Sequence, residues 1–224
     1  MPGLSMLFDF HGNALKREAD FIRSMDSVLP GKQYRREDLF HDNALLLGCT
    51  RYENYPAAAF HGELFSIFLE GRVYGKNLKT LESELTLLAE TLFRDRSRGK
   101  EKLLKWLLAA DGEFVAFIRR RDTGEIILFN DLLGHLPLYC YSNGDFFLIS
   151  REIGIFQTFL SGIQLDRMAV AQYLLFAFSL GSRTLMENVR RVKRASLFHW
   201  VPGDREVNVE TLHELNYDFE EHAG

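Results

Sequence analysis

Apolar and polar positions divide the first half of the chain into strands followed by helices. Residues 4–10 predict a first strand, and residues 63–69 are apolar on both alternating faces, as in a strand buried on both sides. Apolar residues at spacings of three and four predict helices over residues 15–25 and 78–92. The charged segment RDRSRGKEK is predicted to be an exposed connection before another helix over residues 103–110.

The second half of the chain reads mainly as antiparallel hairpins. GEFVAFIRRRDTGEIILFND contains two apolar strands around a turn, and residues 138–141 and 145–150 turn at Asn143-Gly144. Asp166 is the predicted N-cap of a helix that ends near Phe178, and residues 183–207 predict a final strand pair. Segregated helices and hairpins indicate an α+β fold, and strands apolar on both faces indicate a four-layer αββα sandwich of two mainly antiparallel sheets.

Composition narrows the class of protein. The 224 residues are 46% hydrophobic and 26% charged, and they predict one domain over residues 1–224. A net charge of −4 argues against a nucleic-acid partner. Cys49 and Cys140 lie too far apart for a metal motif, and their small number favours a reducing, cytoplasmic compartment. No apolar run reaches about 18 residues, so no membrane partner is expected. We also expect no metal and no cofactor.

Two basic clusters stand out against the acidic total. The first is Arg119-Arg120-Arg121 at a predicted hairpin tip, and the second is Arg190-Arg191-Lys193-Arg194. A nucleic-acid site needs a broad basic face, which an acidic chain does not predict. Both clusters are interpreted as solvated hairpin ends. The second could instead be a docking surface for a partner.

Several motifs occur in a characteristic order between Leu4 and Val201. LEGRVYG spans residues 69–75, and the later stretch LDRMAVAQYLLFAFSLGSRTLMENVRRV follows Ser150. Between them lie the remaining motif positions: Gly112, Phe114, Ala116, Phe117, Asn130, Asp131, Gly134, Pro137, Leu138 and Tyr139. In order and spacing the chain resembles the glutamine amidotransferase domain of the asparagine synthase family, which has an N-terminal-nucleophile hydrolase fold.

The resemblance implies a specific chemistry. In that family an N-terminal Cys thiolate attacks the side-chain amide of glutamine, and its own α-amine serves as the base. Backbone and Asn side-chain donors stabilise the oxyanion. An Arg binds the α-carboxylate of glutamine, and an acidic residue binds its α-ammonium group.

At the catalytic positions the chain departs from this pattern. Pro2 stands where the family has its nucleophilic Cys, so the site has neither thiol nor hydroxyl. Glu70 replaces the oxyanion-binding Asn, although Gly71 is retained. An ionised carboxylate accepts hydrogen bonds but cannot donate them, and it would repel an oxyanion.

The Arg and the acidic residue that bind the substrate in the family have the following nearest matches in this sequence. Thr50 aligns with the Arg position directly, and Arg51 aligns with it after a one-residue shift. The acidic clamp has its nearest match in Ser83-Glu84, inside a predicted helix. The predicted binding residues are therefore Arg51, Glu70, Gly71 and Glu84, with Pro2 at the degenerate catalytic position.

Three functions follow from this comparison. The first is a catalytically degenerate amidotransferase domain that serves as a structural or regulatory partner of an amide-forming synthetase. The second is an active hydrolase of glutamine or another amide that uses Pro2 or Cys49. The third is a sensor that binds glutamine or another amino acid without cleaving it.

The expected partner is a separate ATP-dependent synthetase subunit or domain. Asparagine synthases continue into an ATP pyrophosphatase domain with an S-G-G-x-D-S phosphate loop, and these 224 residues contain no such sequence. We therefore expect no synthetase domain within the chain and no adenylation of a carboxylate by the chain alone.

Overall fold

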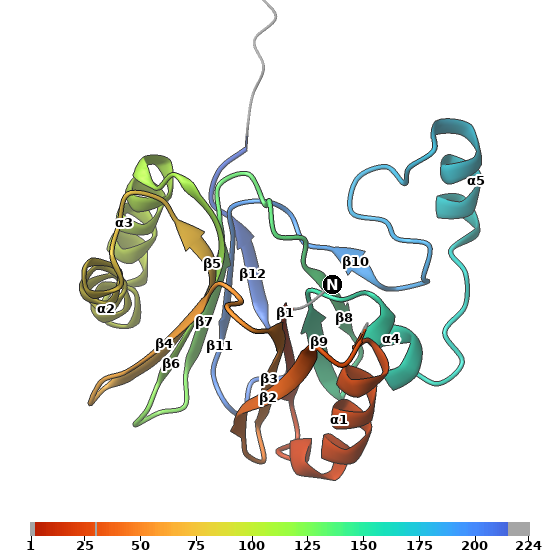
Figure 1. The fold of residues 1–224 in the computed structure, drawn as a ribbon, viewed down its shortest axis with the longest axis horizontal. Coiled ribbons are helices and arrows are strands. Elements are labelled where there is room, and N and C mark those ends of the chain that lie inside the picture. Colours follow the sequence, from red (N-terminus) through yellow and green to blue (C-terminus); the bar gives the residue numbers. More distant parts are fainter. Residues whose placement is uncertain (1–2, 30, 215–224) are drawn as a thin grey trace, which may run out of the picture.

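Two six-stranded antiparallel sheets face each other at the centre of the molecule, with helices on both outer surfaces (Figure 1). The computed structural model describes residues 3–29 and 31–214. Sheet A has the strand order β10-β8-β9-β1-β3-β2, and sheet B has the order β12-β11-β7-β6-β5-β4. The predicted four-layer αββα architecture is confirmed.

The elements have the following bounds. Sheet A contains β1 (Gly3–Asp9), β2 (Tyr34–His41), β3 (Leu45–Tyr52), β8 (Tyr139–Ser142), β9 (Phe146–Ser150) and β10 (Arg190–Arg191). Sheet B contains β4 (Ala57–His61), β5 (Phe65–Val73), β6 (Gly112–Arg120), β7 (Ile126–Asn130), β11 (Ser196–Trp200) and β12 (Asn208–Thr211). The helices are α1 (Glu18–Ser27), preceded by a 3₁₀ turn over Ala14–Arg17, and α2 (Leu78–Arg94), α3 (Arg96–Ala109), α4 (Gly154–Phe159) and α5 (Arg167–Phe176).

Alternation along the strands produces separate apolar layers. On β6, Val115 and Phe117 pack between the sheets, whereas Phe114, Ala116 and Ile118 pack against α2 and α3. A third layer fills the space between sheet A and helices α1 and α4. Because each sheet is covered on both sides, its central strands need apolar residues at nearly every position.

The strand β1 lies in the interior of sheet A, between β3 and β9. Its side chain Phe8 reaches across to sheet B, where its ring packs edge-on against Trp200 of β11 at a centroid distance of 5.3 Å. On its own sheet, Phe8 also contacts the ring of Phe147 at 5.9 Å. The first strand is therefore held by both sheets, which fixes the position of the residues at its start.

The charged segment RDRSRGKEK is mostly helical, so the prediction of an exposed connection was wrong. Asp95 caps α3 by accepting a hydrogen bond from the Arg98 amide at 3.1 Å. Lys100 forms an ion pair with Glu210 on β12. The helix begins with a charged turn, and its first fully buried leucine is Leu103. Apolar periodicity therefore becomes visible only several residues after the helix has begun.

Two of the four edge strands, β2 and β4, were not predicted. Strand β2 has the sequence YRREDLFH, and β4 has AAAFH, so neither alternates between apolar and polar residues. Each lies at the end of a sheet and pairs with one neighbour only. Edge strands commonly carry charged or small residues, and their sequence signal is correspondingly weak.

No helix within the described residues combines the length and apolar character needed to cross a membrane. Over residues 3–29 and 31–214, no group of three or more His, Cys, Asp or Glu side chains is arranged to hold a metal ion.

Gly71 is required where β5 meets β6. Its φ is +99°, and a Cβ there would lie 2.0 Å from the carbonyl oxygen of Glu113. We expect Gly71→Ala to lower the free energy of unfolding by about 3 kcal/mol or more, because backbone strain and overpacking add. Gly75 is the matched control, since its φ is +71° and no atom lies within 4 Å of the added Cβ.

Gly75→Ala should cost only about 1 kcal/mol, the strain of the left-handed conformation. Urea denaturation measures both values. Equal losses in the two variants would show that the contact with Glu113 is unimportant.

Candidate functional site

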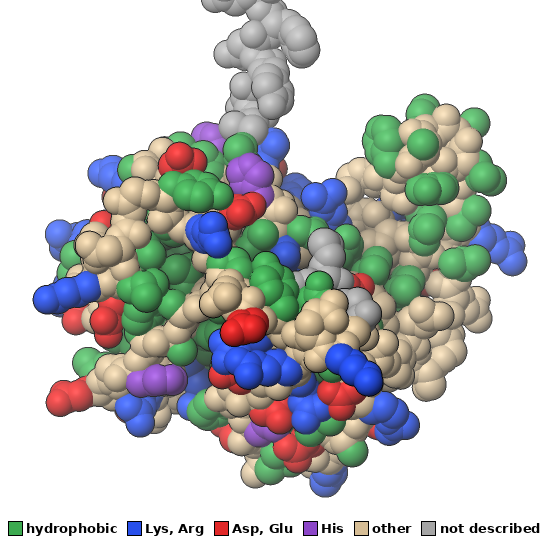
Figure 2. Space-filling view, in the orientation of Figure 1, with side chains coloured by type: hydrophobic (Ala, Val, Ile, Leu, Met, Phe, Trp, Pro, Cys, Tyr) green, Lys and Arg blue, Asp and Glu red, His purple; other side chains and the backbone are tan. Residues whose placement is uncertain are grey.

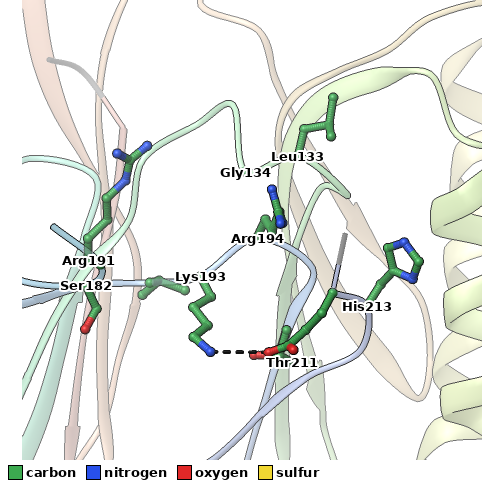
Figure 3. Close-up of a pocket in the computed structure, with 11 residues that line it drawn as sticks. Leu133, Gly134, Ser182, Arg191, Lys193, Arg194, Thr211 and His213 are labelled. Atoms are coloured by element: carbon green, nitrogen blue, oxygen red, sulfur yellow. Dashed lines mark hydrogen bonds and ion pairs between the residues drawn. The ribbon is translucent and has the colours of Figure 1, made fainter. Parts of the chain in front are cut away.

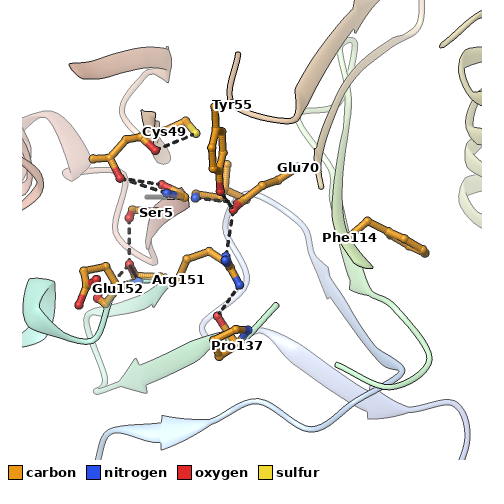
Figure 4. A network of polar contacts seen from close by, with 12 residues as sticks. Ser5, Cys49, Tyr55, Glu70, Phe114, Pro137, Arg151 and Glu152 are labelled. Carbon is orange, nitrogen blue, oxygen red and sulfur yellow. Dashed lines mark hydrogen bonds and ion pairs between the residues drawn. The ribbon is translucent and has the colours of Figure 1, made fainter. Parts of the chain in front are cut away.

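The start of β1 is approached by two charged side chains from other elements (Figure 4). Glu70 belongs to β5 and lies on the same face as Phe68, which packs between the sheets. Its side chain therefore points towards sheet A. Arg151 directly follows β9, the neighbour of β1. The exposed fractions of Glu70 and Arg151 are 0% and 5%, so an ion pair is enclosed between the sheets.

The carboxylate of Glu70 is bonded by three donors. Its Oε2 atom accepts a hydrogen bond from the backbone amide of Leu4 at 2.8 Å. Its Oε1 atom accepts from Nε of Arg151 at 2.9 Å and from the hydroxyl of Tyr55. Such charge-assisted bonds are stronger than neutral ones, and together they offset the cost of removing the carboxylate from water.

Arg151 connects this carboxylate to the rest of sheet A. Its Nη1 atom donates to the carbonyl oxygen of Pro137 at 3.3 Å, and its backbone amide donates to the carbonyl of Leu4 at 3.0 Å. A Cβ built on Gly3 would lie 2.6 Å from Cβ of Arg151 and 2.7 Å from Oε1 of Glu70. The pair therefore fills the space directly beside the first described residue.

Hydroxyl groups complete the polar network. Oγ1 of Thr50 accepts from the Gly3 amide at 3.1 Å, and the Oγ atoms of Ser5 and Ser150 lie 2.9 Å apart. Ser150 also accepts from the amide of Glu152 at 2.9 Å. No histidine among residues 3–29 and 31–214 hydrogen-bonds to these hydroxyls. Among the described residues, these hydroxyls therefore have no histidine base beside them of the kind that activates a nucleophilic serine.

The environment keeps the neighbouring titratable groups neutral. Burial, reinforced by the charges of Glu70 and Glu37, raises the pKa of the Cys49 thiol well above its usual range. The sulfur lies 3.7 Å from the carbonyl oxygen of Thr50. Burial and the Glu70 carboxylate likewise raise the pKa of the Tyr55 hydroxyl. Because the thiolate is the reactive form of cysteine, Cys49 is a poor nucleophile at neutral pH.

The structure brings some of the predicted site residues together. Glu70 and Gly71 are consecutive on β5, beside the start of β1. Arg51 lies on β3, where its Nη2 atom forms an ion pair with Oε2 of Glu37 at 2.7 Å. Its Nε atom is buried without a hydrogen-bond partner among the described residues. Pro2 lies outside the described residues.

Glu84 lies elsewhere, on α2 in the helical layer outside sheet B. Its Oε2 atom accepts hydrogen bonds from Nε1 of Trp106 at 2.6 Å and from Nζ of Lys76 at 2.5 Å. Burial opposes ionisation, but these two bonds outweigh it and lower the pKa of Glu84. The structure therefore separates Glu84 from the Glu70 network and gives it a role in packing the α2–α3 layer.

Arg151 and Tyr55 are the site residues that sequence reasoning did not identify. Arg151 follows the five buried residues of β9, and a charge directly after an apolar strand usually indicates a surface turn. The available sequence signal is the position of Glu70, directly after a strand predicted to be buried on both sides, because a buried carboxylate requires an opposite charge. Nothing local to Arg151 identifies it as that partner.

The most recognisable motif residues shape the fold next to this site. Asp131 accepts hydrogen bonds from the amides of Phe114, Leu133 and His135. Asn130 bonds both the amide of Ser196 and a nearby carbonyl. These residues hold loops against sheet B. Their presence therefore indicates the fold and is no evidence for catalysis.

The donors beside the start of β1 already have an acceptor. The Leu4 amide already donates to Glu70, and the guanidinium of Arg151 already bonds the same carboxylate. The network therefore joins the two sheets and holds the start of β1, and both donors are engaged by Glu70.

The facing sheets, the outer helices and the central first strand define an N-terminal-nucleophile-hydrolase-type fold. The family model of the glutamine amidotransferase domain matches residues 52–210, which is more than half of the chain. The chain therefore belongs to the glutamine amidotransferase domain family.

Two solved structures are similar to the chain. One is glutamine phosphoribosylpyrophosphate amidotransferase from B. subtilis complexed with ADP and GMP, at 13% identity and a TM-score of 0.49. The other is the allosteric regulatory enzyme of purine biosynthesis, at 13% identity and a TM-score of 0.51. Each match covers 94% of this chain and 49% of the other, so the chain spans about half their length. At 13% identity, the similarity to the allosteric regulatory enzyme concerns the fold alone. No curated protein sequence matches the chain.

Glu70 and Arg151 should be strongly coupled in their contributions to the free energy of unfolding. We expect Glu70→Leu and Arg151→Met each to lower the free energy of unfolding by about 3–5 kcal/mol, because each leaves a buried charge unpaired. The double variant should lose at least about 2 kcal/mol less than the sum of the single losses.

The pair Arg36–Asp26 lies at the surface, with side-chain exposures of 22% and 48%, and is the control. Its coupling should be at most about 1 kcal/mol. Urea denaturation of both double-mutant cycles provides the comparison, and additive losses at Glu70 and Arg151 would contradict a coupled pair.

Proposed function

We propose that this chain is a catalytically degenerate amidotransferase domain of the asparagine synthase type. It acts as a structural or regulatory partner of a separate ATP-dependent, amide-forming synthetase. The observation that carries the proposal is the buried Glu70–Arg151 pair at the start of β1. The assignment to the asparagine synthase type rests on the order of motifs between Leu4 and Val201.

Hydrolysis of an amide needs donors aimed at the oxyanion. In this chain Glu70 stands at the position of the family's Asn. Its Oε2 atom accepts a hydrogen bond from the backbone amide of Leu4 at 2.8 Å. Loss of one oxyanion donor costs roughly 100- to 1,000-fold in rate. Here a donor is lost and a negative charge is added in its place, so the loss should exceed that range.

The alternative of an active hydrolase lacks a suitable nucleophile among the described side chains of the network. Cys49 is fully buried, and its raised pKa keeps it protonated. Pro2 could offer only a secondary amine, because its sequence position carries neither thiol nor hydroxyl. Loss of the nucleophile and of an oxyanion donor together favours degeneracy over a replaced mechanism.

A non-catalytic role agrees with the intact architecture of the chain. Asn130 and Asp131 still hold the loops of sheet B, although Glu70 replaces the oxyanion donor. A synthetase served by such a partner would take ammonia from solution or use an amine substrate. The domain would then stabilise or regulate the synthetase without supplying nitrogen to it.

We expect the purified chain to release no ammonia from glutamine above background, because the donors beside β1 are already occupied. A coupled glutamate dehydrogenase assay measures the release, and 6-diazo-5-oxo-L-norleucine should produce no mass shift in the intact protein. Cys49→Ser is the control for thiol chemistry. Ammonia release by the unmodified chain that Cys49→Ser abolishes would defeat the proposal.

The amino-acid sensor is favoured by one feature, the unpaired Nε atom of Arg51. Against it, Glu70 is already bonded to Arg151. Calorimetric titration with millimolar glutamine, asparagine and aspartate separates the two functions. Saturable heat without ammonia release would establish the sensor, and its absence would leave the partner role.

A further inference from the structure

The segment from Leu165 to Leu185, here called the arm, extends away from the sandwich and contains α5 (Figure 1). Nine of the 18 exposed large apolar side chains of the described residues belong to it. They are Leu165, Met168, Tyr173, Leu174, Leu175, Phe176, Phe178, Leu180 and Leu185. Figure 2 shows this concentration of apolar side chains over the projecting segment.

The helix of the arm is apolar without being buried. Ala169 is the buried residue of α5, while Leu174 and Leu175 are 80% and 76% exposed. A ten-residue helix is marginal in water without tertiary packing. Nothing in the described part of the chain covers these side chains.

The base of the arm is firmly held. Asp166 caps α5 by accepting from the amides of Met168 and Ala169, both at 3.0 Å. The same carboxylate forms ion pairs with Arg183 at 2.7 Å and Arg190 at 3.4 Å. The apolar helix is therefore presented from an ordered base.

The exposed area is large enough for a specific interface. At roughly 150 Å² for a large side chain, the nine residues expose on the order of 800 Å² of apolar surface. The largest apolar patch on a typical monomer is about 300–600 Å². A standard protein interface buries about 800 Å² on each partner.

Positive charge surrounds this apolar surface. Six basic and two acidic residues lie between Leu165 and Arg194, although the whole chain has a net charge of −4. Arg191, Lys193 and Arg194 line an open cleft of about 500 Å³ beside the arm (Figure 3). Lys193 pairs with Glu214, but Arg191 and Arg194 have no ion-pair partner in the described part of the chain.

We infer that the arm and this cleft form a docking surface for a different protein, which offers an apolar groove for α5 and acidic side chains for the cleft. A second copy of this chain fits poorly, because a twofold contact through the arm would bring two basic surfaces together. The identity of the partner as a synthetase rests on the proposed function, whereas the surface does not.

A membrane is the less favoured occupant. Helices that lie on membranes carry a charged polar face opposite the apolar one. Helix α5 has the sequence RMAVAQYLLF, in which Arg167 is the only charged residue. Arg191 and Arg194, the two cations without an ion-pair partner among the described residues, line a concave cleft. A protein side chain can enter such a cleft more readily than a lipid surface can.

The test begins with the photocrosslinker p-benzoyl-L-phenylalanine placed at Leu174 in the cells that produce the protein. The crosslinked protein is identified, purified and titrated with the chain. Leu174→Ser/Leu175→Ser should weaken binding by about 30-fold or more, as expected for hot-spot residues. Arg191→Glu/Arg194→Glu should weaken it by about 10-fold and reduce its dependence on salt.

The matched control is Leu87→Ser/Leu108→Ser, because these leucines are 58% and 55% exposed on the distant helices α2 and α3. The affinity of this control variant for the partner should stay within about twofold of that of the unmodified chain, since isolated surface positions contribute little to binding. Circular dichroism and thermal unfolding confirm that each variant is folded.

Three results would overturn the inference: crosslinks only between copies of this chain, no crosslinked protein, or a partner insensitive to the arm or charge variants. Co-sedimentation with phosphatidylserine vesicles that the leucine variant abolishes would assign the arm to membranes instead. If the partner binds as expected but is not an ATP-dependent synthetase, the docking surface stands and the proposed function fails.

Discussion

The buried ion pair of Glu70 and Arg151 is the interaction on which the site depends. It joins β5 of sheet B to the residue that follows β9 of sheet A, and it also engages the amide of Leu4. Neither charge could remain in this interior alone, because the cost of desolvation would be uncompensated. The pair therefore fixes the spacing of the sheets at the start of β1 and determines which polar groups are available there.

The residues that stabilise the fold are different from those that set the chemistry at the start of β1. The fold can therefore persist when the chemistry changes. Asn130 and Asp131 bind loop amides, and Gly71 permits close contact with the carbonyl of Glu113. None of these contacts requires a reaction at β1. By contrast, Glu70 sets the charge and the hydrogen bonding at the start of β1 while leaving the strand in place. Membership of the family and the proposed loss of catalysis are thus compatible in one chain.

Much of the fold could be predicted from sequence because its signals are local. The hairpin formed by β6 and β7 and the cap at Asp166 follow from turn and capping residues alone. The start of α3 was missed because its first turns are charged and its buried leucines come late. The partner of Glu70 could not be predicted, since Arg151 is 81 residues away and only the stacking of the sheets brings them together.

The most direct test of a degenerate site is the release of ammonia from glutamine by the variant Pro2→Cys, with removal of Met1 verified by intact mass. This change places a thiol at residue 2, the proposed nucleophile position, and leaves Glu70 and Arg151 unchanged. If the ion pair blocks the chemistry, the variant will remain at background. Sustained glutamine hydrolysis by Pro2→Cys alone would contradict the account, because the missing sulfur would then be the sole defect.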